Sequence, residues 1–206
     1  MTKIDFKKQL KHLYQPSSKA FAVVDVPPLQ FLMIDGSGDP NSDPAYAAAV
    51  EALYAVAYRL KFLSKQALGQ DYTVMPLEGL WWAEDMATFA GARDKSRWQW
   101  TMMIMQPDWI ASEHYATACA DVARKKNPVA LPLMRFETYA EGLALQILHI
   151  GSYDDEAPTL ARLHSEVMPA QGFTFNGKHH EIYLSDPRRV AAEKLKTVLR
   201  QPVRST

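Results

Sequence analysis

The stretch His179–Pro187 reads His-His-Glu-Ile-Tyr-Leu-Ser-Asp-Pro and sets a glutamate, Glu181, among aromatic and apolar residues. Its aromatic and branched residues predict a β-strand. An earlier stretch, Met75–Ala83, places Glu78 in a comparable run, Met-Pro-Leu-Glu-Gly-Leu-Trp-Trp-Ala. Two related glutamates in aromatic settings indicate a duplicated fold whose halves face one pocket.

Upstream of Glu78, the sequence predicts a strand followed by a helix. The short apolar run Leu29–Ile34 is closed by Asp35–Pro40, whose glycines and proline favour a turn. Asp43 can then cap free backbone amides, and Pro44 is tolerated at the first helical position. Apolar residues follow at helical spacing, so we expect this helix to pack one face on a sheet.

Two strands and a connecting helix follow. The ranges Tyr72–Ala83 and Arg97–Met105 are rich in aromatic and branched residues, and the polar segment Glu84–Ser96 would join them as a long hairpin. A second helix should start at Pro107 and end before Pro128. The first half therefore has the order strand, helix, strand, strand.

The second half repeats that order. Gly142–Ile150 predicts a strand, Pro158–Met168 a helix, Lys178–Ser185 a strand, and Lys196–Val203 a closing strand. Because the order of elements agrees while residue identity between the halves is slight, the repeat is one of fold and not of sequence.

Composition bounds the class of protein. The chain has 206 residues, 48% of them hydrophobic, enough to bury a sizeable core. We interpret 1–206 as a single domain, with module one at about 20–106, a connector helix at about 107–127 and module two at about 133–206. Lys plus Arg equals Asp plus Glu at 23 each, so the positive charge that nucleic acids and anionic membranes select for is missing.

Cysteine content and apolar runs indicate the compartment. Cys119 is the only cysteine, so an intrachain disulfide cannot form and a reducing environment suits the chain. The first eight residues lack the apolar stretch of a signal peptide, and no uninterrupted apolar run approaches about 18 residues. We therefore expect a cytoplasmic protein that binds neither membranes nor nucleic acid directly.

Three segments carry a resemblance to a known family. They are Met33–Asn41 (MIDGSGDPN), His149–Glu156 (HIGSYDDE) and His179–Arg188 (HHEIYLSDPR). Together they resemble the signatures of GyrI-like small-molecule-binding proteins over nearly the whole chain. The resemblance is closest to the standalone branch that includes cyclopropanoid cyclopropyl hydrolases, enzymes that open the strained ring of DNA-alkylating natural products. Other relatives are effector domains of multidrug-sensing regulators.

The resemblance implies an α+β fold of two strand-helix-strand-strand modules related by pseudo-two-fold symmetry. It implies an antiparallel sheet with helices on one face and a ligand cleft on the other face. The family's recurrent pocket glutamate corresponds to Glu181. Strand alternation places Tyr183 on the same face as Glu181, so these two are the candidate catalytic residues.

The candidate ligand-binding residues are Glu78 and three tryptophans. Alternation groups Glu78 with Trp82 and leaves Trp81 on the opposite face. In the next strand Trp98 and Trp100 share one face. The tryptophans Trp82, Trp98 and Trp100 are pocket candidates only if they point away from the helices, since packing against helices is their ordinary role.

The chemistry of such a pocket follows from the residue types. Aromatic planes stack on flat ligands, and a carboxylate among them can attract a cation or serve as a general base. We therefore expect a planar aromatic or cationic small molecule as partner. For a cyclopropane conjugated to a dienone, Glu181 or Glu78 would deprotonate an attacking water, and Tyr183 would stabilise the developing phenolate.

Several alternatives stay open. Both glutamates could occupy exposed strand positions, the usual place of this residue. The protein could bind lipophilic or cationic ligands without chemistry, act as an effector module, or inhibit gyrase through protein contacts. Exposed methionines and tryptophans could also mediate a homodimer.

Metal and cofactor sites are not expected. His179 and His180 point to opposite faces of a strand, and no cysteine pair or helical histidine spacing supports a site that includes His149. The glycines at 36 and 38 lack the following Gly-Lys-Ser/Thr of a phosphate loop, so they favour a tight turn instead.

Overall fold

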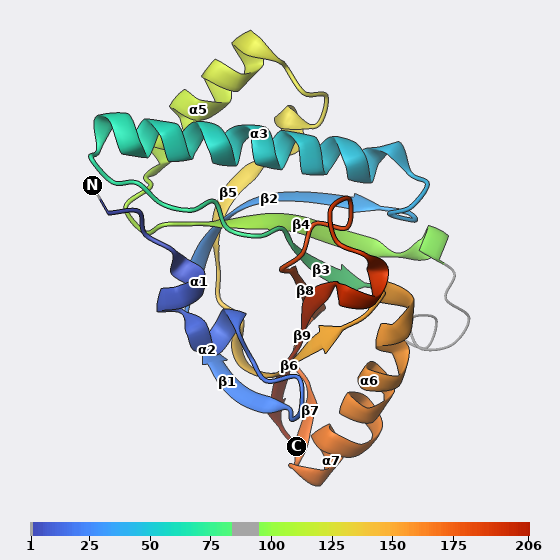
Figure 1. The fold of residues 1–206 in the computed structure, drawn as a ribbon. Helices are drawn as coiled ribbons and strands as arrows, with labels where there is room; N and C mark the ends of the chain where they lie inside the picture. The colour runs from blue at the N-terminus through green and yellow to red at the C-terminus, as the bar shows by residue number, and fades with distance from the viewer. Residues whose placement is uncertain (1, 84–94) are drawn as a thin grey trace.

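The computed structural model describes residues 2–83 and 95–206, and Figure 1 shows their arrangement. Most of the predicted connection Glu84–Ser96 lies outside the described residues. The helices are α1 (Phe6–Gln9), α2 (Lys11–Tyr14), α3 (Pro44–Ala67), α5 (Ser112–Lys125), α6 (Ala157–Arg162) and α7 (Met168–Ala170). The strands are β1 (Ala22–Val26), β2 (Leu29–Ser37), β3 (Glu78–Trp82), β4 (Gln99–Gln106), β5 (Arg135–Tyr139), β6 (Gly142–Ile150), β7 (Phe173–Phe175), β8 (His179–Tyr183) and β9 (Lys196–Ser205).

Local sequence sets where the helices begin. Helix α3 begins at Pro44, and the Asp43 carboxylate accepts the backbone N–H of Ala45 at 2.8 Å, which confirms the predicted cap. Helix α5 begins at Ser112, later than the predicted Pro107. The ring of His114 accepts the N–H of Ala111 at 2.9 Å and satisfies a free amide there, so the helix starts at this point.

The fold is α+β and contains the two predicted modules, β2-α3-β3-β4 and β6-α6-β8-β9. The sheet is antiparallel, with strand order β1-β6-β9-β8-β3-β4-β2-β5, and β7 pairs with β9 off this path. Strands β8 and β3 join the modules at the centre, with Gly79 opposite Glu181 and Leu80 opposite His180. Strands β1 and β5, which the sequence interpretation missed, each precede one module and pair with the outer strand of the other.

Short connections force the sheet to curl. Residues 27 and 28 alone link β1 to β2, although six strand spacings separate them in the sheet, about 29 Å if it were flat. The two linking residues span at most about 11 Å between the strand ends. The connection between β5 and β6 is equally short and joins strands that are also six spacings apart, so it requires the same curvature. Figure 1 shows the resulting curved sheet.

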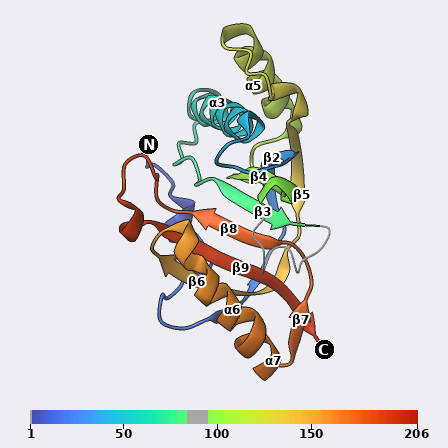
Figure 2. The same cartoon turned by 90° about the vertical axis from the view of Figure 1, so that its right-hand side faces the viewer.

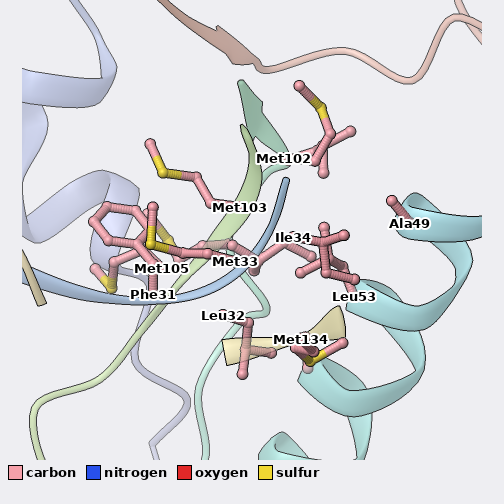
Figure 3. Packing of buried hydrophobic residues seen from close by; sticks show 14 of the residues in the cluster. Phe31, Leu32, Met33, Ile34, Ala49, Leu53, Met102, Met103, Met105 and Met134 are labelled. Carbon is pink, nitrogen blue, oxygen red and sulfur yellow. The ribbon is translucent and has the colours of Figure 1, made fainter. Parts of the chain in front are cut away.

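Alternation along the strands gives the sheet two distinct faces. The face that packs on α3, here called the α3 face, carries Ile34 and Met102; the other face, here called the reverse face, carries Met33 and Met103. In Figure 3, Ile34 lies beside Leu53 of α3, whereas Met103 and Met105 lie on the other side of the strands. Both sets are buried, so the sheet separates two parts of one apolar core.

The longer helices lie on the α3 face, as expected. Helix α5 packs against α3, and Figure 2 shows the segment from α6 to α7 beside the strands of the second module. Leu163 and Met168 of that segment cluster with Leu145 and Val203. The short helices α1 and α2 differ, because they cover the reverse face and bury Leu13 and Tyr14 there. The sequence interpretation gave this N-terminal segment no structure.

Candidate functional site

A cavity of about 1640 Å³ lies on the α3 face, between α3 and the second module. The expectation that the cleft occupies the face opposite the helices is wrong. On the reverse face of β3 and β8, Leu13, Tyr14 and buried charged side chains fill the space. On the α3 face, α3 and the segment at 184–192 stand apart and leave the central strands open to a ligand.

A chain of hydrogen bonds lies on the floor of the cavity. The Tyr183 hydroxyl donates to Glu181 Oε2 at 2.7 Å and accepts from the Trp81 indole Nε1 at 2.9 Å. The ring Nε2 of His179 lies 3.4 Å from Glu181 Oε1. The Glu181 side chain keeps 14% of its surface exposed, so its carboxylate is sheltered and still within reach of a ligand.

Aromatic rings surround this carboxylate. Tyr46 of α3 stacks on Trp81 with ring centres 6.3 Å apart, and Trp98 meets the same indole edge-on at 5.7 Å. Tyr153 meets Tyr183 edge-on at 5.8 Å. These rings come from α3, β3, β8 and the ends of β4 and β6, so both modules contribute apolar area suited to a flat molecule.

The phenols of the cavity stay neutral near neutral pH. Burial, followed by the charge of Glu181, raises the pKa of Tyr183 and of Tyr46 well above the ordinary range. Burial also raises the pKa of Tyr153 to about 12, with smaller contributions from Glu156 and Glu181. Neutral phenols are hydrogen-bond donors, so the site offers several donors near the Glu181 carboxylate.

Gly79 leaves room for the hydrogen-bonded chain. It lies directly opposite Glu181, and a Cβ atom there would come within 2.7 Å of the Trp81 Nε1 and 3.1 Å of the Tyr183 hydroxyl. It would also come within 2.5 Å of the methyl group of Met102. The absence of a side chain at this position therefore allows the indole and the phenol to meet.

The structure brings three of the six predicted site residues to the cavity: Glu181, Tyr183 and Trp98. Glu78 lies on the reverse face, because even-numbered residues of β3 share a face with even-numbered residues of β8. Trp82 shares that face, where Lys178 Nζ lies 3.2 Å from its ring centre. Trp100 is on the α3 face but buried beneath Tyr46, over Gly36.

Sequence reasoning missed Tyr46, Trp81 and Tyr153 as cavity residues. Alternation correctly placed Trp81 on the face opposite Glu78, but the cleft was assigned to the wrong face. Tyr46 lies one turn into α3 on the side that meets the sheet, a position that the helical spacing of apolar residues could have indicated.

Among the described residues, no three His, Cys, Asp or Glu side chains gather closely enough to hold a metal ion. In the same ranges, 2–83 and 95–206, the helices are too short or too polar to cross a bilayer.

Comparison with known proteins identifies relatives of the chain. A family model for the GyrI-like small molecule binding domain matches residues 19–204. A conserved protein from Listeria innocua is 39% identical with a TM-score of 0.89, and a hydrolase from Listeria innocua is 38% identical with a TM-score of 0.87; each alignment covers 98% of this chain and 100% of that chain. The C-terminal domain of EcmrR shares only the fold, at 9% identity and a TM-score of 0.57, over 91% of this chain and 98% of that one. No curated protein matches the sequence.

Proposed function

Because the chain belongs to the GyrI-like small-molecule-binding family, we propose that its cavity binds planar, lipophilic ligands and that Glu181 drives hydrolysis of a strained, cyclopropane-bearing electrophile there. The observation that carries this proposal is the Glu181 carboxylate, held 2.7 Å from the Tyr183 hydroxyl inside an aromatic cavity. Two similar structures from Listeria innocua are described as hydrolases, which supports a reaction over simple binding.

Recognition of the ligand uses ring faces and charge. Tyr46, Trp81 and Trp98 present aromatic surfaces, and each good ring contact contributes about 0.5–1.5 kcal/mol beyond area burial. Glu156 is buried and lines the same cavity as Glu181. Two acidic groups in a sheltered site favour ligands that carry positive charge or that develop it during reaction.

The proposed reaction adds one water to the ligand. Glu181 accepts a proton from a water molecule, and the water oxygen forms a bond to the unsubstituted methylene of the cyclopropane. The bond between that methylene and the ring-junction carbon breaks, and its electron pair moves through the dienone to the carbonyl oxygen. The resulting phenolate takes up the proton. Relief of ring strain supplies the driving force.

The protein's residues orient and stabilise these groups. Tyr183 holds Glu181 Oε2 and is itself held by Trp81, so Oε1, which lies beside the His179 ring, is the oxygen that would accept the water proton. The neutral phenols of Tyr46 and Tyr153 line the same cavity and can donate to the developing phenolate. A positioned base of this kind contributes on the order of 10²- to 10⁴-fold to rate.

The test is incubation of the purified protein with a cyclopropane–dienone compound, followed by mass spectrometry for the water adduct. Glu181→Gln keeps the size of the side chain and removes the base, so the rate should fall on the order of 10²- to 10⁴-fold. Glu166→Gln makes the same change at an exposed position outside the cavity and should leave the rate unchanged. Equal rates for Glu181→Gln and wild type would refute the assignment.

A second candidate function is binding without chemistry. The presence of Glu156 and Glu181 in one aromatic cavity favours it, because such a site suits a flat organic cation with no bond broken. Equilibrium dialysis with the same compound separates the two functions. A compound that binds and is recovered unchanged supports the binder and removes the hydrolase.

A further inference from the structure

The reverse face of the β3–β8 pair carries a chain of buried charged groups. The Tyr14 hydroxyl donates to Glu78 Oε1 at 2.8 Å, and His180 Nε2 lies 2.9 Å from Glu78 Oε2. On its other side His180 Nδ1 lies 2.8 Å from Glu141 Oε1, and Arg200 donates to Glu141 Oε2 at 3.0 Å. The four charged side chains expose only 1–2% of their surface.

The N-terminal segment closes this network. Arg200 donates to the carbonyl oxygen of Leu13 at 2.7 Å, and Gln146 donates to that of His12 at 2.6 Å. Gln146 also accepts from Arg200 at 2.9 Å. Helix α2 therefore covers the charged groups, and charge-assisted hydrogen bonds are strong where water is excluded.

His180 is an imidazolium in this setting. Both of its ring nitrogens face carboxylate oxygens, which can only accept, so both nitrogens must carry a proton. Two carboxylates and two cations then balance formally. The titratable and charged groups that face the ring are Tyr14 of α2, Glu78 of β3, Glu141 of the β5–β6 connection and Arg200 of β9.

Two contacts clamp the same pair of strands from opposite sides. On the reverse face, Glu78 of β3 binds His180 of β8; on the α3 face, Trp81 of β3 binds Tyr183 of β8. Between them lies the register pair Gly79 and Glu181. Because β3 belongs to module one and β8 to module two, this pair is also the junction of the modules at the centre of the sheet.

We propose that His180 is a positioning residue for Glu181: through its contacts with Glu78 and Glu141 it fixes β8 against β3, and so keeps Tyr183 within reach of both Trp81 and Glu181. This inference rests on the proposed function of Glu181 as the base. His180 lies on the face opposite the cavity, so it acts on Glu181 through the backbone of β8 and not by contact with a ligand. A shift of β8 along β3 would separate the phenol from the indole and release the carboxylate.

The test uses the Trp81 indole N–H as a reporter that does not depend on turnover. In ¹⁵N-labelled protein its resonance is assigned with Trp81→Phe, and Tyr183→Phe shows where it lies without the hydrogen bond. His180→Gln should move the resonance toward the Tyr183→Phe position. It should also lower kcat on the order of 10- to 100-fold with little change in KM, the expected cost of a misplaced catalytic group.

Matched controls separate positioning from a general loss of stability. Leu163→Ala removes core volume in the second module, away from the network, and should leave the indole resonance in place. If His180→Gln does not fold, the indole resonance is measured instead in Glu78→Gln and in the wild type titrated to above pH 9. Each of these changes weakens the contact between His180 and Glu78. A folded His180→Gln variant with the wild-type resonance would overturn the proposal. If the wild-type protein shows no turnover, the hydrolase function is refuted. The Trp81 indole resonance would still test whether His180 positions Tyr183.

Discussion

The two faces of the β3–β8 pair use glutamate in opposite ways. On the α3 face, the Glu181 side chain is 14% exposed and receives a hydrogen bond from a neutral phenol. On the reverse face, the Glu78 side chain is 1% exposed, receives a hydrogen bond from Tyr14 and contacts the His180 imidazolium. One carboxylate is open to a ligand, whereas the other is fully occupied by protein partners.

This difference shows what makes a buried carboxylate functional. Both glutamates lie in aromatic stretches of sequence, so residue type does not separate them. What separates them is the face of the sheet on which each side chain lies and the partner that it meets there. A carboxylate that is already neutralised by a cation has no charge left for a ligand.

The largest expected effect on stability is at Glu78. Glu78→Ala removes an acceptor from Tyr14 and from His180 and leaves a positive charge poorly compensated, so it should lower the unfolding free energy by about 3–5 kcal/mol. Glu181→Ala removes a partly exposed acceptor and should cost about 1 kcal/mol or less. Urea unfolding followed by circular dichroism measures both. Similar losses for the two variants would contradict the contrast.

The pH dependence of stability should report the reverse-face network. Burial alone would lower the pKa of His180, but Glu141 and Glu78 outweigh it and raise that pKa from 6.5 to about 9. The stability that this histidine contributes is therefore fully present below pH 6.5 and is lost as pH rises through about 9. The shift corresponds to roughly 3 kcal/mol.

The acid side of the same curve has the opposite sign. Burial would raise the pKa of Glu141, but His180 and Arg200 outweigh it and lower that pKa from 4.5 to about 2. Its contribution is present above pH 4.5 and is lost as pH falls through about 2. Urea unfolding across this range should show a maximum between pH 4.5 and 6.5 that is flattened in His180→Gln. A curve that is level from pH 6.5 to 9 in the wild type would rule out the imidazolium.

The α3 face has its own sensitive position at Gly79. Gly79→Ala places a Cβ atom against Trp81 and Tyr183, so one of the two rings must move and stability should fall by about 1–3 kcal/mol. The indole resonance of Trp81 should move with it, while the pH dependence of stability from the reverse-face network should persist. A variant with unchanged stability and resonance would show that the rings tolerate the methyl group.

Much of the fold could be predicted from the sequence, because strong local signals mark its elements. Asp43-Pro44 fixed the start of α3, and branched and aromatic runs located β2, β4, β6, β8 and β9. Glu181, Tyr183 and Trp98 were predicted as site residues and line the cavity; a glutamate in an aromatic strand and a family signature indicated Glu181, and strand alternation indicated the other two.

The misplaced features depend on long-range pairing. The exchange of β1 and β5 between modules and the register that separates Glu78 from Glu181 are not set by neighbouring residues. Helices α1 and α2 did leave a signal in the sequence, because apolar residues recur there at helical spacing: Phe6, Leu10, Leu13 and Tyr14. That spacing does not reveal which face of the sheet the helix covers, and this face decided where the cavity could lie.

The smallest effect distinguishes two tryptophans on opposite faces. Trp98 lines the cavity and Trp82 does not, although the sequence made both of them ligand-binding candidates. Trp98→Ala should weaken the binding of a planar cationic dye by about 0.5–1.5 kcal/mol, because one aromatic surface is lost. Trp82→Ala removes an equally large ring on the reverse face, where it contacts Lys178, and should leave the dissociation constant unchanged. Fluorescence titration measures both, and a larger loss at Trp82 would place the ligand on the face that the sequence first indicated.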